Sequence, residues 1–256
     1  MTAPPIDQAT LDTAVALLRA AGERTLRWFR AIDLAVERKG DGTPVTAADK
    51  DAERFLREHL ADAFPGDGVL GEEEAPTAGT TGRRWIIDPI DGTKAFACGV
   101  PLYSNLLALE DEHGIAVGVV HLPALGETVW AGRGLGCWSE RGSARVNDQR
   151  SLAGAYVMSS SFSHWAPGRV AALEAAGAVL RTWGDGYGFA LVATGRVTAM
   201  VDPAVQPYDI GPMPVLFAEA GGRFTDLRGE ATIEGGSGLA SNGHVHDELI
   251  ALLGKR

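Results

Sequence analysis

The sequence predicts a mixed fold, in which a unit of helices and antiparallel strands is followed by an α/β unit. Up to about residue 146, two amphipathic helical segments precede a series of short apolar strands, which Asp-, Gly- and Pro-bearing turns separate. From about residue 147 onward, strand and helix segments alternate along the chain. We therefore expect two closely packed units, residues 1–146 and residues 147–256.

Two helices are expected before the first sheet. Apolar residues at helical spacing predict a helix over residues 7–32. A second helix is expected to start after Thr46, which has the side chain of an N-cap. Asp49 stands at the third helical position, where its carboxylate can complete a short capping box. Phe64, Pro65 and Gly66 are expected to end this helix.

Short apolar segments bounded by turn residues predict the strands, and the 3.6-residue period predicts the remaining helices. In the first unit, strands are expected at residues 84–87, 104–109, 115–122 and 128–131. In the second unit, helices are expected at 168–176, 187–194, 210–220 and 244–253. Strands are expected at residues 155–159 and 197–201, with a further short strand between the first two of these helices. The glycine pair at 221–222 is expected to end the third of these helices.

The composition excludes several classes of partner. The chain carries a formal net charge of −10, whereas a nucleic acid or an anionic membrane requires a basic face. No apolar segment reaches the roughly 18–20 residues that span a bilayer. The first ten residues lack the basic and apolar stretches of a signal peptide, so we expect a cytoplasmic protein. Cys98 and Cys137 are expected to be buried free thiols, because two cysteines form no disulfide framework.

The most informative motif is DPIDGT at residues 88–93. The strand before it delivers Asp88 to the end of a sheet, and the following proline is expected to turn the chain. Asp88 and Asp91 can then point into one space, with the carbonyl of Ile90 between them. Three oxygen donors at one turn suit a hard cation such as Mg²⁺ and suit zinc poorly. A helix beginning directly after the motif would present backbone N–H groups to a phosphate.

Each acidic feature also has an ordinary structural explanation. An Asp-Gly pair is common in turns, and the acidic triplet after Gly71 is typical of a solvated loop. Asp209 can serve as the N-cap of the helix that follows it. Asp49 can simply be a first-turn acid that the helix dipole favours. The functional argument therefore depends on the order and spacing of these residues together.

Together these motifs resemble the inositol monophosphatase superfamily, and the resemblance extends over nearly the whole chain. It lies in residues 71–73 (GEE), 85–93 (WIIDPIDGT) and 46–49, and in Asp209 followed by EAGG at 219–222. The resemblance implies a layered αβαβα sandwich, in which helices and sheets alternate, and a homodimer. It also implies a Mg²⁺-dependent phosphomonoesterase that acts on a small phosphorylated metabolite.

Several departures from the inositol enzymes resemble the histidinol-phosphate phosphatase branch. That branch implies hydrolysis of L-histidinol phosphate to L-histidinol and phosphate in histidine biosynthesis. Inositol phosphatases typically carry Trp where this chain has Tyr208, and Thr-Asn where it has Lys94 and Ala95. The segments that carry this closer resemblance are residues 92–96, 99–102, 184–187 and 207–209.

The family also implies a ligand set for two or three Mg²⁺ ions in each active site. Glu72, Asp88 and the carbonyl of Ile90 would hold the first ion. Asp88, Asp91 and Asp209 would hold the second. Glu72 can also reach a weak third ion. Paired cations of this kind lower the pKa of a water and neutralise the charge on a phosphoryl group.

The same resemblance assigns the catalytic groups. Thr93, with its hydroxyl paired to Asp49, would orient the attacking water and accept its proton, and Glu72 would assist as a metal ligand. The backbone amides of Gly92 and Thr93 would bind the phosphoryl oxygens. The mechanism requires no covalent phosphoenzyme, and the chain has no signature of a Cys or Ser nucleophile.

Residues from the second unit are expected to bind the organic part of the substrate. Asp202 matches a position where relatives often have Glu, and Asp185 could pair with a cationic amine. Asp185 could equally be a helix N-cap. Asp91 and Asp209 are expected to contact the substrate as well as the metal.

Three other functions stay open at this stage. The chain could hydrolyse inositol 1-phosphate or a broad range of small phosphates. It could bind Mg²⁺ or phosphate without turnover, although every expected ligand is present. Two carboxylates could also serve a glycosidase, but the DPIDGT turn would have no purpose there.

Overall fold

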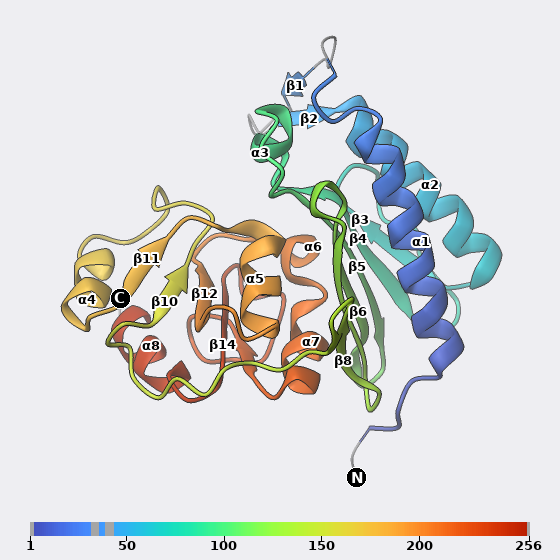
Figure 1. Cartoon of the computed structure of the whole chain (residues 1–256). Helices are drawn as coiled ribbons and strands as arrows, with labels where there is room; N and C mark the ends of the chain where they lie inside the picture. Colours follow the sequence, from blue (N-terminus) through green and yellow to red (C-terminus); the bar gives the residue numbers. More distant parts are fainter. Residues whose placement is uncertain (1–2, 32–35, 39–43, 255–256) are drawn as a thin grey trace.

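Two β-sheets alternate with three layers of helices (Figure 1). The structure, a computed structural model, describes residues 3–31, 36–38 and 44–254. Helices α1 and α2 cover the outer face of the first sheet, and α5, α6 and α7 lie between the two sheets. Helices α4 and α8 cover the outer face of the second sheet. The layered sandwich that the sequence analysis predicts is therefore confirmed.

The first sheet has seven strands in the order β3-β4-β5-β6-β7-β8-β9. Only the β3–β4 pair is parallel, and the other neighbours are antiparallel. The predicted strands are all present, and β3, β8 and β9 were not predicted. The bounds are Gly68–Gly71 (β3), Arg84–Asp91 (β4), Ser104–Asp111 (β5), Gly114–Leu122 (β6), Glu127–Gly132 (β7), Gly136–Ser139 (β8) and Gly142–Ser143 (β9).

The second sheet has five strands in the order β11-β10-β12-β14-β13. Strand β10 is parallel to both of its neighbours, whereas β14 is antiparallel to both of its own. Strands β13 and β14 were not predicted. The bounds are Tyr156–Met158 (β10), Val179–Arg181 (β11), Ala199–Asp202 (β12), Arg223–Thr225 (β13) and Gly238–Ser241 (β14); Val36–Arg38 (β1) and Pro44–Thr46 (β2) form a separate antiparallel pair.

The helices follow the prediction with two exceptions, at the end of α1 and between α6 and α7. The bounds are Gln8–Leu26 (α1), Ala47–Ala63 (α2), Thr93–Ala97 (α3), Arg169–Ala175 (α4), Asp185–Ala193 (α5), Pro207–Ile210 (α6), Met213–Ala220 (α7) and His246–Leu253 (α8), with a short 3₁₀ turn at Pro123–Leu125.

Helix α1 is shorter than predicted. It ends at Leu26 instead of continuing to residue 32, which itself lies outside the described residues. Tighter hydrogen bonds between residues three apart replace the α-helical pattern, as from the Trp28 amide to the Thr25 carbonyl at 3.0 Å. Arg30 then takes a left-handed conformation with φ 63°, which no α-helix can continue.

Helix α2 begins as predicted. Thr46 is its N-cap, and the Oδ2 atom of Asp49 accepts hydrogen bonds from the Thr46 amide at 2.8 Å and the Thr46 hydroxyl at 2.5 Å. This is the predicted capping box, with an aspartate in place of the usual glutamate.

The single helix predicted over residues 210–220 is two helices. Pro212 has no N–H to donate and interrupts the helical pattern between α6 and α7. Gly221 ends α7 in a left-handed conformation with φ 78°, as predicted. The break allows α6 to point toward β4 while α7 packs along β6.

Residue 147 lies between the last strand of the first sheet and the first strand of the second. One apolar cluster nevertheless joins both sheets through α7, and it includes Leu106 on β5, Phe217 on α7 and Met200 on β12. The division into units 1–146 and 147–256 therefore stays a prediction, because the two sheets share part of their core.

Two further predictions concern the whole chain. Both cysteines are free, but the predicted burial is wrong for Cys98, which is exposed at the end of the short helix α3. Cys137 is buried, and burial raises the pKa of its thiol to about 12. In the part of the chain that the structure describes, no helix combines the length and the apolar character that crossing a membrane requires.

His246 and His121 are buried histidines, and both should make stability depend on pH. Burial lowers the pKa of each to about 4. Hydroxyls of Ser241 and Thr225 lie 2.9 Å from the two ring nitrogens of His246. The unfolded chain binds a proton to such a histidine below pH of about 6.5, whereas the folded chain does so only near pH 4. Between these values the unfolded state binds more protons, so the contribution of each histidine is lost as the pH falls.

We expect His246→Asn to flatten this dependence. Between pH 6.5 and 4 the wild type should lose about 3 kcal/mol more of its free energy of unfolding than the variant does. Urea unfolding at a series of pH values measures the difference, with His113→Asn, at an exposed histidine, as the control. Parallel curves for the wild type and His246→Asn would contradict the prediction.

Candidate active site

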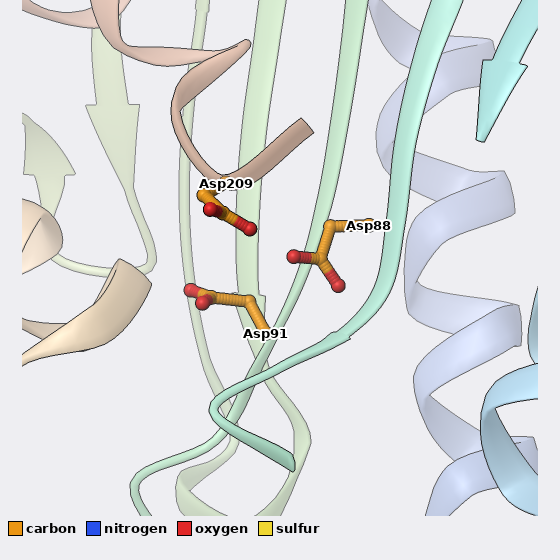
Figure 2. Close-up of side chains that lie close together, drawn as sticks. All are labelled: Asp88, Asp91 and Asp209. Carbon is orange, nitrogen blue, oxygen red and sulfur yellow. The ribbon is translucent and has the colours of Figure 1, made fainter. Parts of the chain in front are cut away.

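Three carboxylates meet where the first sheet faces α6. One oxygen each from Asp88, Asp91 and Asp209 lies within 4.8 Å of the other two. Figure 2 shows the first two on the end of β4 and Asp209 on α6, with all three side chains directed toward one shared space. The exposed fractions of Asp88 and Asp91 are only 1% and 7%. The sequence analysis predicted that these three residues come together.

A β-bulge brings Asp88 and Asp91 to the same side of β4. Residues three apart on a regular strand face opposite sides, because side chains alternate. Asp88 pairs with Leu106 and Asp91 with Ser104, so β4 holds one residue more than β5 over this stretch. The predicted turn at Pro89 is therefore wrong: the strand continues through the bulge to Asp91, and proline is tolerated at such a site.

Asp209 reaches the cluster from the first turn of α6. It is not the N-cap that the sequence allowed. Gln206 is the N-cap, and Asp209 is the third helical residue, whose Oδ2 atom accepts a hydrogen bond from the Gln206 amide at 2.7 Å. This capping box fixes the side chain toward β4.

Asp91 is held from both halves of the chain. Its Oδ2 atom accepts hydrogen bonds from the Ser104 hydroxyl at 2.9 Å and from the Gly186 amide at the start of α5. A Cβ on Gly186 would lie 2.3 Å from the Ser104 Oγ and 2.9 Å from the Asp91 Oδ2. Only a glycine lets the backbone of α5 come this close to the carboxylate.

The carboxylates of the cluster carry charges of the same sign, so each disfavours ionisation of the others. Burial raises the pKa of Asp88 well above its usual value, and the charges of Glu72 and Asp91 raise it further. Burial and the charge of Asp185 have the same effect on the pKa of Asp91, and burial raises the pKa of Asp209 to about 7. Crowded carboxylates of this kind favour a bound cation, and hard oxygen donors fit Mg²⁺.

Glu72 follows β3 and lies close to Asp88, since its charge has the largest effect among the charges that raise the pKa of Asp88. The loop that carries it is anchored by Glu53 on α2, a fully buried carboxylate that accepts hydrogen bonds from the Glu73 amide at 2.8 Å and the Glu74 amide at 3.1 Å. Arg57 pairs with the same carboxylate at 2.8 Å. The backbone of the acidic triplet is therefore anchored to α2, with Glu72 at the cavity and Glu74 exposed to solvent.

Gly71 makes this anchoring possible. A Cβ at this position would lie 2.1 Å from the Glu53 Oε1 atom, inside the buried ion pair. The GEE motif thus combines a residue without a side chain, which accommodates Glu53, with Glu72, which lines the cavity.

The predicted pairing of Thr93 with Asp49 is wrong for this structure. The Thr93 hydroxyl donates instead to the Ile90 carbonyl at 3.1 Å. The capping box uses the Oδ2 atom of Asp49, and its Oδ1 atom is buried without a hydrogen-bond partner among the described residues. Burial raises the pKa of Asp49 to about 6. Asp49 therefore has one free oxygen and a pKa suited to proton exchange near neutral pH.

Gly92 begins α3 in a left-handed conformation with φ 82°. It lines the cavity together with Thr93, and a Cβ on Gly92 would lie 2.9 Å from the Oδ2 atom of Asp185. The narrow gap places the predicted phosphate-binding segment directly opposite a residue of the second half. The phosphate-binding role of Gly92 and Thr93 stays a prediction.

The cluster opens into a cavity of about 450 Å³ between the two halves. Five acidic residues line it: Glu72, Asp91, Asp185, Asp202 and Asp209. Other residues at its wall include Lys94, Val100, Ser160, Ser161, His164 and Phe189. All the predicted substrate-binding residues therefore reach one cavity.

Asp185 is not the N-cap of α5. Gly184 takes that position, and Asp185 is the first helical residue, with a left-handed φ of 54°. Burial raises the pKa of Asp185 and raises that of Asp202 to about 6. Asp202 accepts hydrogen bonds from Ser159 and Ser160, two residues that the sequence analysis did not identify.

Comparison with known proteins agrees with this fold and site. A sequence profile of the inositol monophosphatase family matches residues 7–255. Because this match covers nearly the whole chain, the protein belongs to the inositol monophosphatase family, a family of metal-dependent phosphatases.

Individual members of the family are similar to this chain over nearly their whole length. The histidinol-phosphatase of Mycobacterium tuberculosis is 42% identical over 252 residues, which cover 95% of this chain and 97% of that protein. The fructose-1,6-bisphosphatase/inositol-1-monophosphatase of Thermotoga maritima is 32% identical over 245 residues, 95% of each chain. The structure of the extragenic suppressor protein suhB of Bartonella henselae matches with a TM-score of 0.89 and 28% identity, over 96% of this chain and 98% of that one.

Proposed function

We propose that this protein hydrolyses L-histidinol phosphate to L-histidinol and phosphate in a Mg²⁺-dependent reaction. The observation that carries the proposal is one cavity that holds a metal-type carboxylate cluster together with two further acidic residues, the half-buried Asp185 and the buried Asp202. A phosphate monoester with an ammonium group matches this cavity, because the two further carboxylates attract a cation. Relatives named histidinol-phosphatase, 39–42% identical, support the same substrate.

The residues of the cluster would hold the metal. Glu72, Asp88, Asp91, Asp209 and the Ile90 carbonyl provide hard oxygen donors for two or three Mg²⁺ ions. When bound, these ions would lower the pKa of a water and neutralise the charge on the phosphoryl group.

The neighbouring residues would guide the water and the phosphate. The Thr93 hydroxyl would orient the attacking water, and Asp49, with a free Oδ1 atom, would accept a proton. The amides of Gly92 and Thr93 would bind phosphoryl oxygens as charge develops on them. The organic part of the substrate would then lie toward Asp185 and Asp202, with Asp91 and Asp209 between it and the metal ions.

Inositol 1-phosphate is the second candidate substrate, because the relative from Thermotoga maritima carries that activity in its name. A neutral polyol can donate hydrogen bonds to the same carboxylates. It gains less than an ammonium group from their charge, which favours the histidinol ester.

The test is phosphate release from histidinol phosphate and inositol 1-phosphate, each with and without Mg²⁺. We expect turnover only with Mg²⁺. The kcat/KM for histidinol phosphate should exceed the kcat/KM for inositol 1-phosphate by about 10²-fold or more. A preference for inositol 1-phosphate would be consistent with the proposed metal site but would show that the proposed substrate is wrong. Release without a divalent ion, in a chelator, would overturn the metal assignment.

We further propose that the enzyme is a cytoplasmic homodimer that serves histidine biosynthesis. Light scattering of the purified protein measures the mass in solution, and a single-chain mass would overturn the dimer. Growth of a histidine-requiring strain that lacks its own histidinol phosphatase tests the metabolic role.

A further inference from the structure

Ser160, in the segment after β10, is hydrogen-bonded to the Asp202 carboxylate and to the backbone amide of Asp185, two acidic residues that line the cavity. Its hydroxyl donates to the Oδ2 atom of Asp202 at 2.5 Å, and its amide donates to the Oδ1 atom at 2.9 Å. The same hydroxyl oxygen accepts a hydrogen bond from the Asp185 amide at 2.7 Å. One serine thus connects the end of β12 with the start of α5.

The contact with Ser160 leaves little conformational freedom to the backbone at the start of α5. A Cβ on Gly184 would lie 2.2 Å from the Ser160 Cα, so the two backbones are in direct contact. The next residue, Asp185, has a left-handed φ of 54°, a conformation that strains residues other than glycine. The hydrogen bond from its amide to Ser160 helps to hold that conformation. Strain of this kind persists only where the surroundings enforce it.

The hydrogen bonds also determine which part of Asp202 is free. A carboxylate has about four acceptor positions. The Oδ1 atom accepts from the Ser159 hydroxyl at 3.1 Å and from the Ser160 amide, and among the described residues the Oδ2 atom accepts from the Ser160 hydroxyl alone. The remaining acceptor position therefore lies on Oδ2, and Asp202 lines the cavity.

We propose that Ser160 is a positioning residue for substrate selectivity: it holds Asp202 and Asp185 so that both carboxylates face the cationic part of the substrate. This inference rests on the proposed function for the identity of that cation. Ser160 acts through these two residues and not through the metal cluster, because its hydrogen bonds to carboxylate residues within the described part of the chain involve Asp202 and Asp185.

The test compares Ser160→Ala with the wild type on two substrates, histidinol phosphate and p-nitrophenyl phosphate, which has no ammonium group. We expect kcat/KM for histidinol phosphate to fall about 10- to 100-fold, mainly through KM. Activity on p-nitrophenyl phosphate and the Mg²⁺ concentration for half-maximal rate should stay within about twofold of the wild type. Ser163→Ala is the matched control, since Ser163 lies in the same segment and contacts neither carboxylate.

A double-mutant cycle shows whether Ser160 acts through Asp202. The double variant Ser160→Ala/Asp202→Asn should lose less kcat/KM on histidinol phosphate than the two single losses together, because the part of the Ser160 effect that runs through Asp202 is already gone. Fully additive losses would mean that Ser160 acts by its own contact with the substrate, and an equal loss on both substrates would mean a general structural defect. Either result overturns the proposal.

A wrong substrate and a wrong role for Ser160 would give different results. If the wild type does not prefer histidinol phosphate, the proposed substrate is wrong, and a crystal structure of Ser160→Ala then decides. Displacement of the Asp202 or Asp185 carboxylate would support the positioning role. Carboxylates that keep their wild-type positions would overturn it.

Discussion

Asp88→Asn is expected to abolish turnover and, at the same time, to stabilise the metal-free protein. Asp88 stands between Glu72, Asp91 and Asp209, and its carboxylate is almost fully buried among them. An asparagine has the same shape without the charge, and its amide can donate hydrogen bonds to the neighbouring carboxylates. Relief of like-charge repulsion should raise the free energy of unfolding by about 1–2 kcal/mol, or Tm by roughly 3–6 °C.

The same substitution removes a shared ligand of the proposed metal pair. We expect kcat to fall about 10³-fold or more. Mg²⁺ should raise the Tm of the wild type, because it binds only the folded state, and should raise that of Asp88→Asn much less. Thermal unfolding of both proteins, with chelator and with Mg²⁺, measures the two effects together. A metal-free variant less stable than the wild type, or one with ordinary activity, would contradict the prediction.

Asp226→Asn provides the matched control. Asp226 is equally buried, but it accepts hydrogen bonds from the Arg228 amide and guanidinium at 2.8 Å each and from the Glu230 amide at 3.0 Å. Loss of its charge should destabilise the fold and leave activity unchanged. Opposite changes in stability at two buried aspartates would separate the electrostatics of the active site from those of an ordinary loop.

The sequence predicts which residues form the cluster but not how they reach one face. Asp88 and Asp91 belong to one local motif, and Asp209 follows from family resemblance. The bulge that aligns the first two is set by pairing between β4 and β5, in which the Asn105 side chain donates to the Pro89 carbonyl. That partner lies 16 residues along the chain, so local spacing carries no sign of it.

The pairing of Thr93 with Asp49 fails for a different reason. The sequence assigns Asp49 two roles, a capping box and a partner for Thr93. In the structure the capping box is formed, and the Thr93 hydroxyl bonds to the nearby Ile90 carbonyl. Contacts three residues apart form with little loss of chain entropy, whereas a contact across 44 positions depends on the whole fold.

Ser160 shows the limit of sequence patterns in the second half. It lies in a run of three serines that has neither helical nor strand periodicity. Its two partners are 42 and 25 residues away, on β12 and α5. Strands β13 and β14 are only three and four residues long. Segments of this length are too short to show the alternation of apolar and polar residues from which a strand is predicted.

Gly186→Ala is the second substitution with a large expected effect, because it moves Asp91 without changing any carboxylate. The added Cβ would lie 2.3 Å from the Ser104 Oγ and 2.9 Å from the Asp91 Oδ2, so the carboxylate must shift. A displacement of about 1 Å at a reacting site can lower a rate about 10²-fold. We expect a loss of that size in kcat/KM, together with a higher Mg²⁺ concentration for half-maximal activity.

Gly188→Ala, two residues further along α5, is the control that distinguishes displacement of the Asp91 carboxylate from general crowding of the helix. Its Cβ would lie 2.6 Å from the Met200 Sδ and 2.8 Å from the Trp183 carbonyl oxygen, so it should destabilise the protein too. None of those contacts is a carboxylate of the cluster, and its Mg²⁺ dependence should match that of the wild type. If both variants lost activity and Mg²⁺ affinity to the same extent, the loss would come from disturbance of α5. If only Gly186→Ala changes the Mg²⁺ dependence, the backbone of the second half sets the geometry of a metal ligand in the first.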